Sequence, residues 1–522
     1  MIKIIKRLIF FITSISLFAG CDKDFKTLNT NPYAIPSVDP ALLFAGAQRT
    51  HIGTWTGEHT IVQQFVTPYN TGANLGFSFN ADIDGMSTPK WGEYNSSIKN
   101  MVQALNLLGP NTAQVNLRSI IRIWKAQVFM GLVDDYGDVP YSQAGKGFSE
   151  KLFFPKYDDD AVIYDSLYKE LKEGIAGLNP GADFVSADLF YGTNAQPSAK
   201  SINAAQQVPK WKKLGYSLLL RLGMRYTKLN LAKAKSIVEE AYAGGVMTSN
   251  ADNAYVKYDG TNYVEVDNNN LRSFSQYNYA AEPFVNLLKS TKDPRGKYIL
   301  GTFADPGNPA AVPAVYDTVL NNQFGVPIGK TDAQLSIANG GRGGRGAGLN
   351  YSQVNIWSVA SSAAPDFWVT YAQTSLLLAE AAFRGWNVGG VSAQTYYENA
   401  IAADMAVYSL YPVTSAIPAA DVTAYINDPA ILYNTTDALK LINTQYWIVN
   451  IRNGTEAFAN FRRSGFPALT PNPVVGVLGS PGFARRLSYP DAEASANTAN
   501  YNAAAAAIGG DKLTSRVFWD IP

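Results

Sequence analysis

Apolar residues recur along most of the chain at the spacing of an α-helix. Between Leu117 and Leu132 they follow one another at intervals of 3, 1, 3, 4, 3 and 1 residues, which places them on one face of a helix over about residues 115–133. A later helix, which ends at Gly385, is expected to begin with Asp366 as its cap. The same pattern predicts further helices over residues 160–178, 211–229, 232–243, 393–408 and 437–451.

Helices that follow one another in close pairs predict an all-α fold. The segments 211–229 and 232–243 form one such pair, and stacked pairs of this kind build the core of tetratricopeptide-type superhelices. No repeat of about 34 residues, the length of that unit, is evident in the sequence. The expected fold, a tetratricopeptide-like superhelix of helical pairs, therefore depends on the spacing of the helices and not on sequence repeats.

Long polar stretches separate the predicted helices and are rich in tyrosine and asparagine. A disordered linker would contain few aromatic residues, and loops of this length in a compact protein usually carry function. We therefore expect a large, irregular, loop-rich lobe that binds the ligand. The stretches are residues 66–98, 182–208, 248–280, 301–364 and 465–510, and the third contains Tyr255, Tyr258, Tyr263, Tyr277 and Tyr279.

Residues 1–20 have the pattern of an export signal. Three basic residues precede a mostly apolar run of 13 residues, from Leu8 to Gly20. This run is shorter than the roughly 20 residues that a membrane-spanning helix needs. It ends directly before Cys21, the only cysteine of the chain, and so resembles a bacterial lipoprotein signal. The resemblance implies that Cys21 is acylated and becomes the mature N-terminus; an ordinary signal peptide followed by an incidental free cysteine is the alternative.

The segment after the signal is expected to be a lipidated tether and extended strap over residues 21–40, followed by a single helical domain over residues 41–522. Residues 22–24, Asp-Lys-Asp, resemble the signal that sends some Gram-negative lipoproteins to the outer leaflet of the outer membrane. A solvated tether fits these three residues as well. We expect a protein on the extracellular face of the outer membrane, anchored in its lipid through acylated Cys21.

The charge balance narrows the class of ligand. The chain has 43 basic and 42 acidic residues, and only 16% of its residues are charged, whereas it contains 30 Tyr, 25 Phe and 9 Trp. A nucleic-acid-binding protein needs a basic face that displaces counterions, so nucleic acid is not an expected partner. An uncharged, polar and aromatic surface suits a neutral, hydroxyl-rich ligand.

Signatures of catalysis and metal binding are weak. One cysteine and two histidines, His51 and His59, are too few for a cysteine-rich or multi-histidine metal site. Residues 341–346 match the glycine spacing of a dinucleotide-binding loop, but no helix follows directly, so a plain loop is expected. The acids at 158–160 are interpreted as a helix cap that faces water, rather than a cation site or a catalytic pair. We therefore expect no enzyme activity, no cofactor and no metal.

Short motifs follow one another in order over nearly the whole chain. Residues 137–141 read Gly-Asp-Val-Pro-Tyr, and residues 378–386 read Leu-Ala-Glu-Ala-Ala-Phe-Arg-Gly-Trp. Further segments of this kind are 24–32, 293–295, 325–329, 396–397, 445–447, 461–467, 486–497 and 517–520. Their order and number resemble the SusD/RagB family of nutrient-binding outer-membrane lipoproteins, and its SusD-like branch in particular.

This resemblance implies an architecture and a partner. It implies one α-helical domain of tetratricopeptide-like pairs with an irregular ligand lobe, which acts as an extracellular lid on a SusC-like TonB-dependent transporter. The motif residues themselves are interpreted as structural. Gly137 and Pro140 are expected to form a turn, and Glu380 is expected to pair with Arg462 or Arg463 between helices.

Ligand binding is expected to depend on aromatic stacking. Sugars present apolar C–H faces to aromatic rings, while amide and carboxylate side chains bind their hydroxyl groups. Glycan sites of the family vary in sequence, so no binding residue is carried over from it. The candidates are Trp91 with Asn95 one helical turn later, Tyr69 and Asn70, Tyr277, and Tyr351 with Trp357.

Three functions are open at this point. The first is capture of a glycan oligomer and its delivery to the SusC-like transporter. The second is capture of an oligopeptide by a lipoprotein of the same kind, and the third is a scaffold that supports the transporter lid without binding substrate itself. If the ligand is anionic, Arg342 and Arg345 in the glycine-rich loop are the residues expected to bind it.

Overall fold

The computed structural model describes residues 38–53, 55–70, 76–274, 278–311 and 315–522, apart from the side chains of residues 273–274. Residues 1–39 and 40–522 form two separate units, and the helices and strands named below belong to the second. The predicted signal segment, Cys21 and nearly all of the predicted tether lie outside the described residues. Among the described helices, none is both long and apolar enough to cross a membrane.

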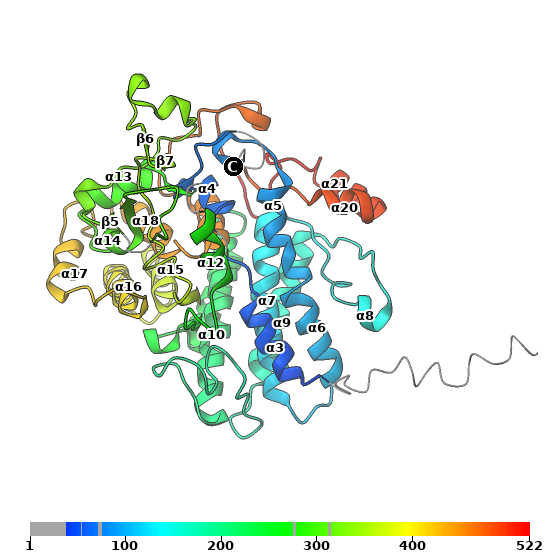
Figure 1. Cartoon of the computed structure of the whole chain (residues 1–522). Coiled ribbons are helices and arrows are strands. Elements are labelled where there is room, and N and C mark those ends of the chain that lie inside the picture. Colours follow the sequence, from blue (N-terminus) through cyan, green and yellow to red (C-terminus); the bar gives the residue numbers. More distant parts are fainter. Residues whose placement is uncertain (1–37, 54, 71–75, 275–277, 312–314) are drawn as a thin grey trace, which may run out of the picture. The chain divides into compact units, whose positions relative to one another are not determined.

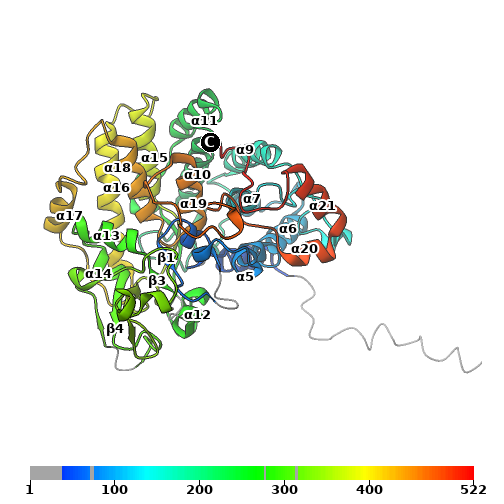
Figure 2. The same cartoon turned by 90° about the horizontal axis from the view of Figure 1, so that it is seen from above.

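Four pairs of helices make the most extensive contacts in the second unit, and this confirms the predicted fold of helical pairs. Figure 1 shows the pair over residues 115–136 and 160–177 lengthwise, and Figure 2 shows the pair over residues 371–383 and 393–407 lengthwise. The pairs are α7 (Val115–Tyr136) with α9 (Asp160–Gly177), α10 (Ala204–Arg225) with α11 (Leu231–Gly244), α15 (Tyr371–Phe383) with α16 (Ala393–Val407), and α3 (Pro40–Arg49) with α6 (Ser97–Leu108).

The central helix, α7, is buried on nearly all sides. Eighteen of its 22 residues are buried, although its spacing predicted one apolar face. It packs against α6, α9 and α10, and also against α19 (Gly454–Ser464), so every face meets another helix. Gly137, with a φ of 77°, ends the helix in a conformation that favours glycine and begins the turn that the sequence predicted.

Polar side chains cap the starts of four of the paired helices, α10, α11, α15 and α16. The side chains of Asn203, Asn230 and Ser392 each accept a hydrogen bond from a backbone N–H in the first turn of α10, α11 and α16. Thr370 and Gln373 form a capping box at the start of α15. These caps satisfy N–H groups that have no partner within the helix.

Asp366 does not cap α15, and this part of the sequence prediction was wrong. It lies in β9 (Asp366–Val369), which pairs antiparallel with β2 (Ala254–Val256), and its carboxylate pairs with Arg452. The Phe-Trp-Val residues that follow Asp366 favour a buried strand, so the helix begins only at Tyr371.

The long polar stretches form an irregular lobe that contains small antiparallel sheets. Strands of only two to four residues were not predicted, because so short a segment shows no period. The main sheet has the order β1 (Phe65–Val66), β3 (Tyr279–Ala280), β8 (Gln353–Val354), β4 (Leu300–Phe303), β5 (Tyr316–Asp317). In the glycine-rich segment, β6 (Gly344–Arg345) and β7 (Gly348–Leu349) form a hairpin with no helix after it, in place of a dinucleotide-binding loop.

Further α-helices complete the second unit (Figure 1). They are α4 (Glu58–Ile61), α5 (Asp84–Trp91), α8 (Gly147–Glu150), α12 (Val266–Phe274), α13 (Glu282–Ser290), α14 (Gly296–Ile299), α17 (Ala419–Ile426), α18 (Ala438–Val449), α20 (Asp491–Ala496) and α21 (Thr498–Ala507).

A buried ion pair joins two helices that are far apart in the sequence. Arg463 of α19 donates two parallel hydrogen bonds of 2.8 Å to the carboxylate of Glu380 in α15. Both side chains are at most 2% exposed. Arg462 instead donates to the backbone carbonyls of Asp134 and Arg485. The prediction that Glu380 pairs with one of these two arginines is therefore confirmed, with Arg463 as the partner.

Candidate ligand-binding site

A cavity of about 800 Å³ opens beside Trp91, and we call it the Trp91 cavity. Three segments that are distant in the sequence line it: residues 88–103, which include η3 (Gly92–Tyr94) and the first half of α6, then residues 140–155, and finally residues 490–493. Its volume lies within the range of about 300–1,000 Å³ that is usual for small-ligand sites. Two of the sequence candidates, Trp91 and Asn95, line this cavity.

Trp91 forms part of the cavity wall and belongs to the hydrophobic core. Its ring centroid lies 5.0 Å from those of Tyr94 and Tyr136, 5.8 Å from Tyr489 and 5.9 Å from Tyr157. Only 9% of its surface is exposed. Trp91 is therefore not the free stacking platform that the sequence suggested, and its packing gives the cavity a rigid wall.

The tyrosines around Trp91 are held by hydrogen bonds. The hydroxyl of Tyr94 donates to the carbonyl of Pro140 at 2.7 Å, and that of Tyr157 donates to Glu493 Oε2 at 2.8 Å. Burial and the neighbouring charge of Glu493 raise the pKa of Tyr157, so its hydroxyl keeps the proton that it donates. These bonds connect all three lining segments and pre-form the cavity.

Two phenylalanines that the sequence analysis did not select provide exposed aromatic rings. Phe148 in α8 is 76% exposed, Phe153 is 67% exposed, and both line the cavity. Lys151, in a left-handed conformation with a φ of 57°, ends α8 and turns the chain between them. Clustered large apolar side chains on a surface usually mark an interaction site.

Amide side chains from α6 and the residues before it supply the polar part of the cavity. Asn95, Asn100 and Gln103 line it, and their side chains make no hydrogen bond with any described residue. Asn100 and Gln103 come from neighbouring turns of α6, and Asn95 comes from the end of η3 just before that helix. Each side-chain amide has N–H donors and an acceptor oxygen. It can therefore either donate a hydrogen bond to a ligand hydroxyl group or accept one from it.

The other sequence candidates lie elsewhere. Tyr69 and Tyr351 pack together in a small second core around Tyr279, and Tyr351 is buried, so its ring is not available for stacking. Trp357 is half-buried, its indole N–H donates to the carbonyl of Pro309, and Arg272 lies over its ring at 4.7 Å. Asn70 is exposed. Tyr277 lies outside the described residues.

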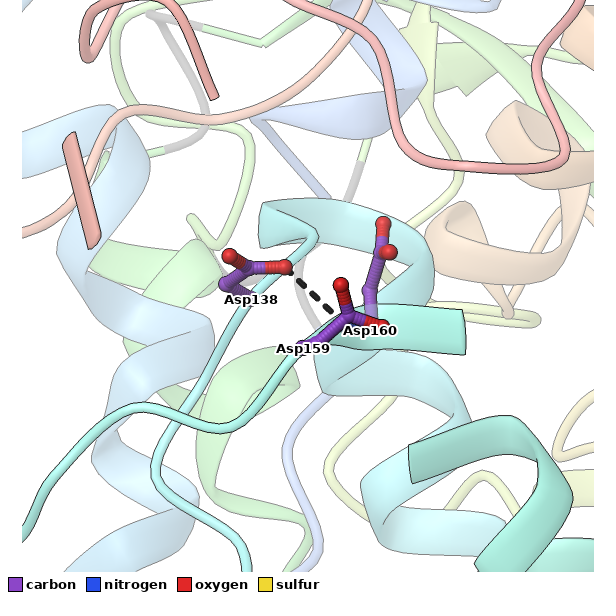
Figure 3. Close-up of side chains that lie close together, drawn as sticks. All are labelled: Asp138, Asp159 and Asp160. Carbon is purple, nitrogen blue, oxygen red and sulfur yellow. Dashed lines mark hydrogen bonds between the residues drawn. The ribbon is translucent and has the colours of Figure 1, made fainter. Parts of the chain in front are cut away.

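In the acidic segment at the start of α9, one carboxylate caps the helix and faces water as we expected, but another is buried. Asp159 is exposed and caps the helix by accepting a hydrogen bond from the Val162 N–H at 3.0 Å. Asp160 is buried, and its carboxylate accepts from the Phe518 N–H at 2.8 Å. Asp138 accepts from the Asp160 N–H, so three carboxylates approach one another (Figure 3). Protein N–H groups hold all three carboxylates in place, so the cluster is explained by its structural role.

This cluster predicts a pH dependence of stability. Burial, together with Asp138 and Asp159, raises the pKa of Asp160 from 3.8 to about 7, against the lowering effect of the Phe518 N–H. The folded state therefore holds this proton more tightly than the unfolded state, and stability is lost as pH rises from about 4 to about 7. Asp160→Asn keeps an acceptor for Phe518 but has no charge to bury. The melting temperature of Asp160→Asn should rise relative to that of the wild type between pH 5 and pH 8. A constant difference in melting temperature across that range would contradict the assignment.

The fold therefore consists of helical pairs with an open cavity lined by aromatic and amide side chains. Comparison with family models gives the family: residues 32–490 match the SusD-like family, which is described as starch-binding and associating with the outer membrane. The chain belongs to this SusD-like family, the one that its motifs resemble. Among curated proteins, no sequence matches the chain.

Solved structures agree with the family assignment. A chitin-binding protein is 27% identical, with a TM-score of 0.73, and the similarity covers 93% of this chain and all of that one. A SusD-like protein described as Bacteroidetes AC2a is 23% identical, with a TM-score of 0.75 and the same coverage. A chitin-binding SusD homologue from Flavobacterium johnsoniae is 20% identical, with a TM-score of 0.70, over 92% of this chain and 98% of that one. The last two similarities show the fold.

Proposed function

We propose that this protein captures neutral oligosaccharides at the bacterial cell surface and that the Trp91 cavity is the capture site. The observation that carries the proposal is the combination, in one cavity, of exposed aromatic rings with amides that make no hydrogen bond to another described residue. Phe148 and Phe153 supply the rings, and Asn95 and Gln103 are among the amides. Few other ligands than sugars need both an apolar face and many uncharged hydrogen-bonding groups.

Binding would proceed with little rearrangement. The apolar C–H face of a pyranose ring stacks on Phe148 or Phe153, while its hydroxyl groups exchange hydrogen bonds with the amides of α6 in place of water. The packed wall around Trp91 does not have to move, so little conformational entropy is lost on binding. Because the two phenylalanines are exposed, the units of a longer oligomer can continue into solvent on either side.

The relatives suggest which oligosaccharide to test first. The family is described as starch-binding, and the solved relative at 27% identity is a chitin-binding protein. We therefore take oligomers of N-acetylglucosamine as the first candidate ligand and oligomers of glucose as the second. The acetamido groups of N-acetylglucosamine would add a donor and an acceptor for the amide-lined wall.

Affinity electrophoresis of the full-length protein in detergent, against a panel of polysaccharides and peptides, tests this function. Retardation by at least one neutral glycan is expected, and it should be the same at low and high salt, since a neutral ligand releases no counterions. Binding to peptides with no retardation by any glycan would instead establish the oligopeptide function. Binding to neither would leave the role of a scaffold for the transporter.

Delivery of the captured glycan requires a partner in the membrane. We propose that the protein lies at the extracellular face of the outer membrane and passes its ligand to a SusC-like TonB-dependent transporter. The description of the family, which includes association with the outer membrane, supports this location. Acylated Cys21 is proposed as the anchor, because it directly follows the apolar signal segment.

Cys21→Ala tests the anchor. The substitution should leave the fold unchanged, because the helical unit begins at Pro40. It should abolish labelling of the protein by radioactive palmitate and release the protein into the periplasm. A variant that stays bound to the membrane and exposed at the cell surface would show that lipid on Cys21 is not the anchor.

A further inference from the structure

A second cavity, of about 510 Å³, lies between the C-terminal end of α3 and two loops of the irregular lobe, at residues 189–194 and 256–263. We call it the Tyr263 cavity. It shares no lining residue with the Trp91 cavity. Its walls carry Arg49, Lys257, Tyr263 and Asn194, so its chemistry differs from that of the amide-lined capture site.

The turn that holds Tyr263 is rigidly built. Asp259 Oδ1 accepts hydrogen bonds from the N–H groups of Thr261, Asn262 and Tyr263 at 2.8, 2.9 and 2.8 Å. The carbonyl of Tyr263 accepts in return from the N–H of Asp259 at 2.9 Å. Gly260 allows the tight bend with a φ of 74°. The position of the Tyr263 ring is therefore set by the backbone and not by a ligand.

Stacked planar groups make up one wall of this cavity. The rings of Tyr258 and Tyr263 stack with centroids 5.0 Å apart and planes 24° from parallel. The guanidinium carbon of Arg49 lies 4.6 Å from the centroid of Tyr263. Stacking occupies a face of the guanidinium and leaves its N–H edge free, and that edge is the part that binds a carboxylate through two parallel hydrogen bonds.

Three polar groups of this cavity form no hydrogen bond or ion pair within the part of the chain that the structure describes. The side chains of Arg49 and Lys257 make no ion pair or hydrogen bond with any described residue. The Tyr263 hydroxyl is buried and also lacks a hydrogen-bond partner among the described residues. A buried hydroxyl without a partner costs free energy, and a ligand that bonds to it recovers this cost. Two cations against the single carboxylate of Asp259 leave a net positive charge in the cavity.

We propose that the Tyr263 cavity is a second glycan site and that it binds the uronic acid unit of an acidic oligosaccharide. The sugar carboxylate would bridge the edge of Arg49 and the ammonium of Lys257, and a sugar hydroxyl would bond to the Tyr263 hydroxyl. This inference goes beyond the capture of neutral glycans, and it depends on that proposal only in assuming that the protein meets glycans at all.

The test compares each of three acidic trimers with its neutral methyl ester. Isothermal titration calorimetry of the full-length protein would use trigalacturonate, triglucuronate and trimannuronate, each beside its methyl ester, which keeps the sugar but neutralises the carboxylates. At least one acid should bind at least tenfold more tightly than its ester, with an affinity that falls as salt rises. Arg49→Gln should remove this preference for the acid, and Tyr263→Phe should weaken binding of the acid several-fold.

Arg345→Gln is the matched control, because Arg345 is exposed, also makes no ion pair with a described residue, and lies in the β6–β7 hairpin. It should bind the acid as the wild type does. If all acids and esters bind equally or not at all, or if Arg345→Gln loses the preference and Arg49→Gln keeps it, the proposal is overturned. Binding of an N-acetylglucosamine hexamer by Arg49→Gln should equal that of the wild type, and this separates a failure here from a failure of the capture site.

Discussion

Glu380→Ala should lower the free energy of unfolding by about 3–5 kcal/mol, because it leaves the guanidinium of Arg463 buried without its counter-charge. Arg463 directs both of its terminal nitrogens at this carboxylate, and Arg384 and Asn443 also donate to it. Chemical denaturation should show a lower midpoint with an unchanged slope.

The pH dependence of the same pair gives an independent check. Burial alone would raise the pKa of Glu380, but the charges of Arg463 and Arg384 lower it from 4.5 to about 2. The ion pair therefore contributes stability above about pH 4.5, and this contribution is lost as pH falls towards 2. The difference in unfolding free energy between the wild type and Glu380→Gln should shrink over that range.

Glu173→Ala serves as the control for both measurements. Glu173 pairs with Arg122 at 2.5 Å, but its side chain is 46% exposed, so water replaces the lost partner. Little change in stability is expected. A loss in Glu173→Ala as large as that in Glu380→Ala would mean that burial does not determine the strength of these pairs.

The helical pairs were predictable because their apolar spacing is long and regular. The starts of α11 and α16 lie within one residue of the predicted starts at 232 and 393, whereas α10 begins at Ala204, seven residues before the predicted start at 211. The helices α6 and α19 were missed, although apolar residues such as Ile98, Met101 and Leu105 of α6 recur at helical spacing. Part of their burial comes from segments that are distant in the sequence, because α6 packs against α3 and α19 packs against α4 and α7.

The candidate site was predictable only in part. Trp91 and Asn95 do line one cavity, yet the sequence could not show that four tyrosines cover the Trp91 ring, because Tyr136, Tyr157 and Tyr489 come from other parts of the chain. The exposure of Phe148 and Phe153 could have been predicted from the sequence, although we did not predict it. Together with Phe154 they place three phenylalanines within seven residues, in a segment with neither helical nor strand periodicity. Apolar residues without a period are candidates for exposure.

Replacing both Phe148 and Phe153 by Ala should weaken binding of an N-acetylglucosamine hexamer by at least about 30-fold. By analogy with bases stacked on aromatic rings, each lost platform costs about 1–3 kcal/mol, so two independent platforms cost about 2–6 kcal/mol. Both rings are exposed, so the free energy of unfolding should change by less than about 0.5 kcal/mol. Isothermal titration calorimetry and denaturation of the same preparation measure both quantities.

Phe154→Ala is the matched control for this double variant. Phe154 is 62% exposed and directly follows Phe153, but it does not line the Trp91 cavity. Its loss should leave hexamer binding unchanged. An equal loss of binding in Phe154→Ala would show that general apolar exposure of this loop matters and not stacking inside the cavity.

A crystal structure of the protein with a bound N-acetylglucosamine hexamer tests the central claim most directly. The account predicts sugar rings against Phe148 and Phe153, with hydroxyl or acetamido groups bonded to Asn95, Asn100 or Gln103. The rings of Trp91 and its four tyrosines should keep the positions that they have without ligand. A hexamer bound at another surface, with the Trp91 cavity filled only by water, would contradict the assignment of the capture site.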